Sequence, residues 1–201
     1  MHLIGVYDYT VILTYISLVS SLVGMVNAYQ DRFSLAVCLL MLSGFCDMFD
    51  GIVARSKKDR TADEKSFGIQ LDSLNDVICF GVFPAVLLYF RGVTTAIGIA
   101  ALVVYVLCAL IRLAFFNVME TNRQMTEDGC AKEYHGLPVT MSAVILPLFF
   151  AIGSLLPQTV SLVIYHVLPL AVGFLFVLDF RVPKIDFAKL FKERKSHKTA
   201  V

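Results

Sequence analysis

The chain has 201 residues, of which 58% are hydrophobic and 16% are charged, and its mean hydropathy is +0.76. This composition excludes an ordinary soluble domain and predicts an integral membrane protein. We expect a single domain over residues 1–201, with a basic cytoplasmic tail from about residue 181. The formal net charge is only +1, and we expect no nucleic-acid partner.

Six hydrophobic segments each approach the roughly 20 residues that a membrane-crossing helix needs. They cover residues 10–29, 33–54, 68–90, 93–117, 137–156 and 159–179. Several of the joints between them are short and polar, which favours tight antiparallel turns. The sequence therefore predicts an all-α, polytopic membrane protein with six transmembrane helices.

Positive charges are distributed unevenly between the joints. Of the 17 Lys and Arg residues, five lie in segment 55–65, two in segment 118–136 and seven after Asp179. These segments share one side if six helices alternate, and the opposite side carries only Arg32 and Arg91. Because basic joints stay in the cytoplasm, we expect both termini to be cytoplasmic, in the plasma membrane.

Four aspartates interrupt the apolar sequence of the second and third segments: Asp47, Asp50, Asp72 and Asp76. A charge near the centre of a bilayer costs about 2.5–3.5 kcal/mol on insertion scales, so four unpaired ones would cost about 10–14 kcal/mol. That cost is comparable with the whole stability of an ordinary domain, roughly 5–15 kcal/mol. The carboxylates therefore require a positive partner, and bound divalent cations are the simplest one.

Helical geometry places these carboxylates on two faces. At 100° per residue, Asp47 and Asp50 lie on one side of the helix predicted over residues 33–54. Asp72 and Asp76 likewise share one side of the helix predicted over residues 68–90. If the two sides face each other, they form an oxygen-rich site, which favours Mg²⁺, Mn²⁺ or Ca²⁺ over zinc or copper. Two ions about 3.5–4 Å apart would suit four carboxylates and a phosphate-rich substrate.

Small residues lie on the acidic face of the helix predicted over residues 33–54. Gly51 and Ala54 lack bulk, so a flat ligand can approach the backbone there. Arg55, at the end of the helix, is well placed to bind a phosphate. The pattern indicates a site for a metal-bound diphosphate with a nucleotide beside it. The alternatives are aspartates that make structural hydrogen bonds or line a proton relay.

The chain resembles the CDP-alcohol phosphotransferases in an eight-position pattern, Asp47-x2-Asp50-Gly51-x2-Ala54-Arg55 followed by Gly68-x3-Asp72-x3-Asp76. Twelve residues separate Arg55 from Gly68, a few more than is usual in that family. The additional stretch is polar and includes Lys57 and Arg60. It falls in a predicted cytoplasmic loop, where an insertion is tolerated.

The resemblance implies a role for each position of the pattern. Mg²⁺ or Mn²⁺, as two ions, would be held by four carboxylates: Asp47, Asp50, Asp72 and Asp76. The CDP moiety would be bound by Gly51, Ala54, Arg55 and Gly68. Asp76 would also be catalytic, accepting the proton of the attacking hydroxyl group. The ions would neutralise the diphosphate and stabilise the departing CMP.

Within the family, the segment from Ser66 to Ala85 resembles the enzymes that use serine as the acceptor. Ile111-Arg-Leu-Ala-Phe-Phe-Asn117 is similar to their Leu-Arg-Leu-Ala-Arg-Phe-Asn, with Phe115 in place of the second arginine. The resemblance implies transfer of a phosphatidyl group from CDP-diacylglycerol to L-serine. Arg112 and Asn117 are candidates for binding the acceptor; alternatively, Arg112 pairs with one of the aspartates or with Glu120.

Other functions remain open at this point. The acceptor could be glycerol phosphate or inositol phosphate, and the donor could be an archaeal CDP-diether lipid. From a different class, the carboxylates could form the ion pathway of a cation transporter, although the joints on the opposite side contain almost no ionisable residues. The resemblance also implies a homodimer.

Overall fold

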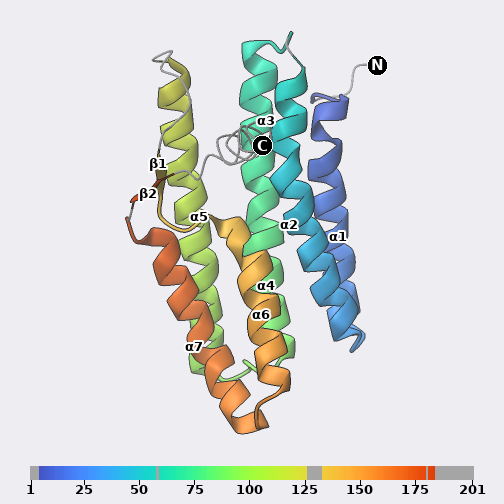
Figure 1. The fold of residues 1–201 in the computed structure, drawn as a ribbon, viewed down its shortest axis with the longest axis vertical. Coiled ribbons are helices and arrows are strands. Elements are labelled where there is room, and N and C mark those ends of the chain that lie inside the picture. The colour runs from blue at the N-terminus through green and yellow to red at the C-terminus, as the bar shows by residue number, and fades with distance from the viewer. Residues whose placement is uncertain (1–4, 58, 126–132, 180, 184–201) are drawn as a thin grey trace, which may run out of the picture.

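The computed structural model describes residues 5–57, 59–125, 133–179 and 181–183. In these residues seven α-helices form a bundle (Figure 1). Their bounds are α1 Ile12–Tyr29, α2 Phe33–Ser56, α3 Ala62–Asp76, α4 Phe83–Phe90, α5 Ala96–Met125, α6 Ser142–Ser154 and α7 Gln158–Val177. The helices α3 and α4 continue each other in one direction, and the other successive helices run antiparallel. Shorter elements are the helical turns Tyr9–Val11, Val77–Val82 and Val139–Met141 and an antiparallel pair of strands, β1 Glu133–His135 and β2 Arg181–Pro183.

Five helices of the described chain are long and apolar enough to cross a membrane. They are Tyr9–Tyr29, Phe33–Ala54, Ala62–Phe90, Ala96–Thr121 and Gln158–Val177. A shorter apolar helix, Val139–Ser154, occupies the predicted span 137–156. The all-α class and the integral membrane character are confirmed, with one short strand pair added. The count of six crossings and the cytoplasmic orientation stay predictions.

The helix α3 begins at Ala62, upstream of the start at residue 68 that hydrophobicity predicted. Thr61 caps this end. Its hydroxyl oxygen accepts from the Glu64 backbone N–H at 3.2 Å, and the Glu64 carboxylate accepts from the Thr61 backbone N–H at 2.9 Å. This reciprocal pair satisfies N–H groups that the start of a helix leaves without helical partners. The cap thus adds a polar first turn and places Gly68 inside the helix.

The helix formed by α3, the turn Val77–Val82 and α4 is the most buried of the five candidate spans. Phe83 and Leu87 are fully buried in it. A Cβ atom added at Gly24 of α1 would lie 2.3 Å from the Phe83 ring, so α1 approaches closely only because this residue is glycine. Small residues permit such contacts between membrane helices. The central helix therefore sets the positions of its neighbours.

A π-helical turn, Val77–Val82, directly follows Asp76. Within it, the Phe80 carbonyl oxygen accepts hydrogen bonds from the hydroxyl groups of Tyr105 at 2.6 Å and Ser142 at 3.3 Å. Single π turns inside α-helices occur frequently at functional sites. Here side chains from α5 and α6 fix the segment that follows the last of the four aspartates.

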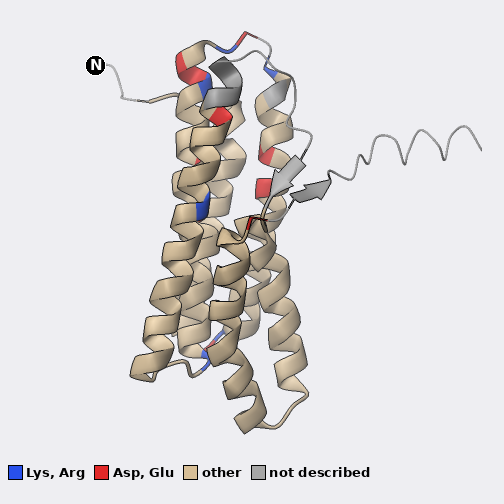
Figure 2. Cartoon of the chain, turned by 90° about the vertical axis from the view of Figure 1, so that its left-hand side faces the viewer, with Lys and Arg blue, Asp and Glu red and all other residues tan. Residues whose placement is uncertain are grey.

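The helices differ in how much of the bundle they cover. In Figure 1, α6 and α7 lie along the lower part only, whereas α5 runs the whole length. Charged residues gather in the upper part of the molecule, where α2 ends and α3 begins, and few lie at the lower end (Figure 2). The bundle therefore has a charged end and an apolar end.

Candidate active site

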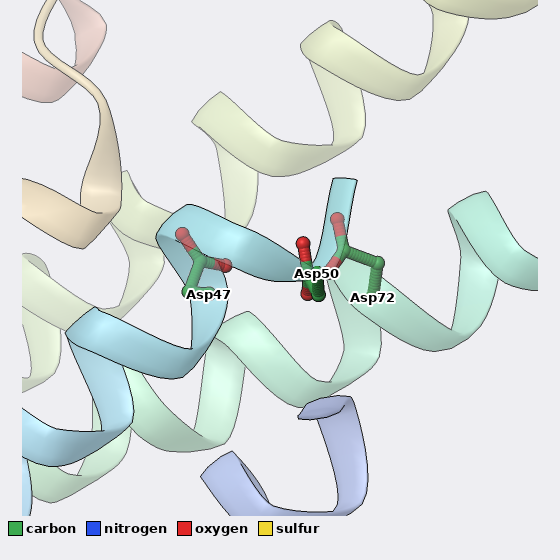
Figure 3. A group of neighbouring side chains, drawn as sticks. All are labelled: Asp47, Asp50 and Asp72. Atoms are coloured by element: carbon green, nitrogen blue, oxygen red, sulfur yellow. The ribbon is translucent and has the colours of Figure 1, made fainter. Parts of the chain in front are cut away.

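Helices α2 and α3 bring three carboxylates together. Asp47 and Asp50 lie on α2 and Asp72 lies on α3, and each offers an oxygen within 4.8 Å of the others (Figure 3). Asp76, one turn further along α3, is 6% exposed, and its carboxyl group contacts that of Asp47. Helical spacing predicted an acidic face on each helix, and the condition that the two faces meet is fulfilled for Asp47, Asp50 and Asp72. The catalytic and metal-binding roles stay predictions.

Two oxygens of this cluster are buried without a partner. Oδ1 of Asp72 and Oδ1 of Asp76 are inaccessible and accept no hydrogen bond. Lys57 makes ion pairs with Asp8 and Glu64, away from the cluster, and among the described side chains no Lys or Arg forms an ion pair with the four aspartates. Buried polar atoms are almost always satisfied, and an uncompensated buried charge is costly.

A divalent cation fits these observations. Asp47, Asp50 and Asp72 could hold one, because their oxygens converge and come from carboxylates only. Hard oxygen donors suit Mg²⁺, Mn²⁺ or Ca²⁺. An ion at this place would also give the buried oxygen of Asp72 the partner that it lacks.

A cavity of about 150 Å³ adjoins the cluster. Asp50 and Asp72 form part of its wall, together with Gly51, Ala54 and Gly68. Three of the four residues predicted to bind CDP therefore line one cavity beside the carboxylates. The fourth, Arg55, is in the last turn of α2, and its side chain lies outside the described residues.

The cavity has further polar walls that the sequence did not identify. Thr10 and Thr14 come from the start of the first helix, and Arg60 and Lys65 come from the α2–α3 joint and the first turns of α3. A signal for the threonines exists, because Thr10, Thr14 and Ser17 recur at helical spacing on a buried face. Nothing in the pattern indicated that Arg60 would turn inward.

A buried polar network lies next to the aspartates and joins α1, α2 and α3. The hydroxyl groups of Ser17 and Ser43 are 2.7 Å apart, and Ser21 donates to Ser43 at 3.0 Å. Asn75, beside Asp76, donates to Ser17 at 3.5 Å and accepts from Cys79 at 3.3 Å. The network satisfies these side chains internally. It therefore positions the helices without consuming the carboxylate oxygens of the cluster.

The two candidate acceptor residues lie on α5. Arg112 is 8% exposed, and its Nε donates to the Leu137 carbonyl oxygen at 3.4 Å. No ion pair within the described ranges joins it to any of the four aspartates, so the alternative in which Arg112 neutralises the cluster is not observed. Asn117 accepts a hydrogen bond from Ser73 at 2.7 Å and thereby ties α5 to α3.

Comparison with known proteins places these features in a family. The model of the CDP-alcohol phosphatidyltransferases matches residues 9–177. The archaetidylserine synthase of Methanothermobacter thermautotrophicus is 33% identical over 177 residues, covering 86% of this chain and 65% of the relative. The CDP-diacylglycerol–serine O-phosphatidyltransferase of Methanocaldococcus jannaschii is 30% identical over 170 residues, covering 85% and 72%.

The enzyme of the same name from Saccharomyces cerevisiae is 33% identical over 149 residues, covering 64% of this chain and 52% of the relative. The chain thus spans between about half and three quarters of the length of these relatives. The matched region contains all four aspartates and the residues of the adjoining cavity. With the family model extending over most of its length, the chain belongs to the CDP-alcohol phosphatidyltransferase family.

Proposed function

We propose that this protein transfers the phosphatidyl group of CDP-diacylglycerol to L-serine, giving phosphatidylserine and CMP. The observation that carries the proposal is the cluster of converging carboxylates, with buried oxygens that lack partners, beside a cavity walled by Gly51, Ala54 and Gly68. The choice of serine rests on relatives that are named serine O-phosphatidyltransferases.

The metal-holding residues in this proposal are Asp47, Asp50 and Asp72, with Asp76 contributing to a second Mg²⁺ or Mn²⁺ ion. When bound, the ions neutralise the diphosphate and stabilise negative charge on the leaving group. The CDP moiety is bound by Gly51, Ala54, Arg55 and Gly68. The small residues on the two facing helices let a flat nucleotide approach the backbone, and Arg55 is assigned to a phosphate group.

The proposed reaction is a single displacement at the lipid-linked phosphorus. The serine hydroxyl oxygen forms a bond to this phosphorus, and the bond from the phosphorus to the bridging oxygen of the diphosphate breaks. CMP leaves with that oxygen and its electron pair. Asp76 accepts the hydroxyl proton, for which its buried position among other carboxylates is favourable.

Acceptor binding is assigned to Arg112 and Asn117. A guanidinium in an apolar span needs an anion, and serine offers a carboxylate. A guanidinium carries five N–H groups, and among the described residues one of them donates to Leu137; Asp179 also interacts electrostatically with Arg112, and the remaining donors are assigned to the serine carboxylate. The single domain, the homodimer and an active site at the cytoplasmic leaflet complete the proposal.

One alternative donor has specific support. A relative with 33% identity is named archaetidylserine synthase, and a CDP-diether lipid would present the same diphosphate and cytidine to the cavity. Lipid tails would meet only the apolar sides of the helices, so the polar site does not discriminate between the two donors.

The deciding experiment measures CMP release by the purified protein with Mn²⁺ or Mg²⁺. The donors are CDP-diacylglycerol and a CDP-diether lipid, and the acceptors are serine, glycerol phosphate and inositol phosphate. We expect release with serine. Release with inositol phosphate but not serine would reject the assigned acceptor, and no release with any acceptor would reject the transferase.

A further inference from the structure

The joint between α2 and α3 sends one cationic side chain back into the cavity. Arg60 lines the cavity beside Gly68 and Asp72. Its Nη2 donates to the Glu64 carbonyl oxygen at 3.0 Å, and its Nη1 lies 3.4 Å from the Ala54 carbonyl oxygen. Its Nε is buried and has no hydrogen-bond partner. The guanidinium is thus held at its tip and retains unused donors.

Gly68 is the residue that makes room for this guanidinium. A Cβ atom at position 68 would lie 2.6 Å from Nη2 of Arg60. The contact places the charge against the small-residue wall that also contains Ala54. This wall is where the proposed function seats the nucleotide, so Arg60 lies where phosphate oxygens would arrive.

The charge of Arg60 is not used elsewhere in the described structure. Its neighbour Lys57 pairs with Asp8 at 2.9 Å and with Glu64 at 3.1 Å. Arg60, by contrast, contacts carbonyl oxygens and forms no ion pair with any described carboxylate. A guanidinium with free donors in a polar cavity matches phosphate oxygens, which it can bind through two parallel hydrogen bonds.

The joint is also anchored on both sides of Arg60. Lys57 ties it to Asp8 and Glu64, and Thr61 caps α3 through its bonds with Glu64. A side chain between two such anchors loses less freedom when it binds a ligand. Arg60 lies outside the eight-position pattern, so its role is not one that the pattern itself identifies.

We propose that Arg60 binds a phosphate group of the cytidine-diphosphate donor and thereby contributes to donor affinity. The proposal rests on the proposed function for the identity of the ligand. It assigns the α2–α3 joint a role in substrate recognition. Lys65, another cation in the cavity wall, adds positive charge on the same side.

The test measures binding of CDP to the purified, full-length protein in Mg²⁺ by calorimetry, without any acceptor. Arg60→Gln should weaken CDP binding about 10-fold to 100-fold, the range expected for loss of charge-assisted hydrogen bonds. Lys57→Gln is the matched control, because it removes one charge from the same joint outside the cavity wall and leaves in place the Thr61 cap and the carbonyl contacts that hold Arg60. It should change CDP affinity by less than about threefold, the range of a partly exposed ion pair.

A double-mutant cycle separates a direct contact from a general disturbance of the joint. Gly68→Ala should weaken CDP binding in the wild-type background, because the new methyl group displaces Arg60. In the Arg60→Gln background the same change should cost less, since the charge is already gone. Fully additive effects would show that Gly68 acts independently of Arg60.

The outcomes distinguish this inference from the proposed function. Unchanged CDP affinity in Arg60→Gln, with CMP release from CDP-diacylglycerol intact, would overturn the role of Arg60 and leave the transferase standing. Weakened CDP affinity in a protein that releases no CMP with any alcohol would reject the transferase and keep the CDP contact. Failure of the wild-type protein to bind CDP would overturn the role of Arg60.

Discussion

The charged and the apolar ends of the bundle differ in what their buried atoms contact. At the apolar end, α4 and α6 contribute fully buried side chains to one hydrophobic core: Phe83, Leu87 and Leu88 from α4 and Leu146 from α6. At the charged end, Asp72 and Asp76 each leave a buried oxygen without a partner. One continuous helix, Ala62–Phe90, runs through both. Packing at one end therefore holds in place a set of carboxylates that would not assemble by themselves.

Cavity size does not distinguish the two ends. A cavity of about 260 Å³ lies at the apolar end, where Arg91, Gln158 and Tyr165 are part of its wall, and no carboxylate is among its lining residues. A smaller one, about 150 Å³, has Asp50 and Asp72 in its wall. The charged end is distinguished instead by buried polar atoms that have no hydrogen-bond partner.

The sharpest way to test this contrast is to remove one carboxylate from each side of the cluster. Asp76→Asn should lower kcat by about 10²–10⁴-fold, the usual contribution of a general base, while CDP-lipid binding is retained through the ion held by Asp47, Asp50 and Asp72. Asp47→Asn should weaken CDP-lipid binding, because it removes a metal ligand. Turnover and lipid binding are measured on the same preparations. Equal loss of binding in the two variants would contradict a separate role for Asp76 as the base.

A variant at the apolar end should show the reverse behaviour. Phe83→Ala leaves a void against Gly24 and the core, and should lower the free energy of unfolding by about 3–5 kcal/mol. Activity per folded molecule should change little, since Phe83 lies outside the cavity beside the aspartates. Denaturant unfolding in detergent micelles and CMP release are compared. A loss of kcat as large as that of Asp76→Asn would show that the two ends are not separable.

Metal addition should stabilise the folded protein through the carboxylates of the charged end. At 100 times its Kd, Mn²⁺ should raise the free energy of unfolding of the wild-type protein by about 2.7 kcal/mol. Asp50→Asn should lose most of this gain, because one of three converging ligands is gone. With EDTA, Asp50→Asn should be more stable to unfolding than the wild-type protein, since the variant carries one fewer buried carboxylate. Equal stabilisation of both proteins by Mn²⁺ would place the ion elsewhere.

Much of the charged end could be predicted from helical periodicity. The spacing of Asp47 and Asp50 on one segment, and of Asp72 and Asp76 on the next, is sufficient to define two acidic faces, and the structure brings Asp47, Asp50 and Asp72 together. The start of α3 was predicted too late because hydrophobicity was the criterion. The Thr61-x-x-Glu64 pattern carried the correct start, since it is the sequence signature of a capping box.

Other parts of the site depend on contacts that periodicity does not encode. Arg60 enters the cavity because Gly68 leaves space and Ala54 and Glu64 offer carbonyl oxygens. Those carbonyls belong to two helices whose separation is a tertiary property. The bonds from Tyr105 and Ser142 to the π turn after Asp76 likewise join segments distant in sequence. Such features follow from packing, and no single-segment pattern predicts them.

The smallest expected effect concerns the ion pair that closes the charged end. Asp8 accepts hydrogen bonds from the backbone and hydroxyl of Thr10, and Lys57 donates to it at 2.9 Å. These bonds lower the pKa of Asp8 to about 2, the Thr10 hydroxyl contributing most and Lys57 next. Because the pKa is lower in the folded state, the stabilisation is present above the ordinary value of 3.8 and is lost as pH falls towards 2.

Asp8→Asn should therefore lower the midpoint of denaturant unfolding slightly at neutral pH, as expected for a partly exposed ion pair. The difference from wild type should shrink between pH 4 and pH 2, because the wild-type carboxylate becomes protonated in that window. Lys57→Gln should show a similar small effect at neutral pH, since it breaks the same pair. A difference that stays constant down to pH 2 would mean that Asp8 stabilises the end through packing of the first turn. The anchor of the α2–α3 joint would then be the Thr61 cap rather than the ion pair.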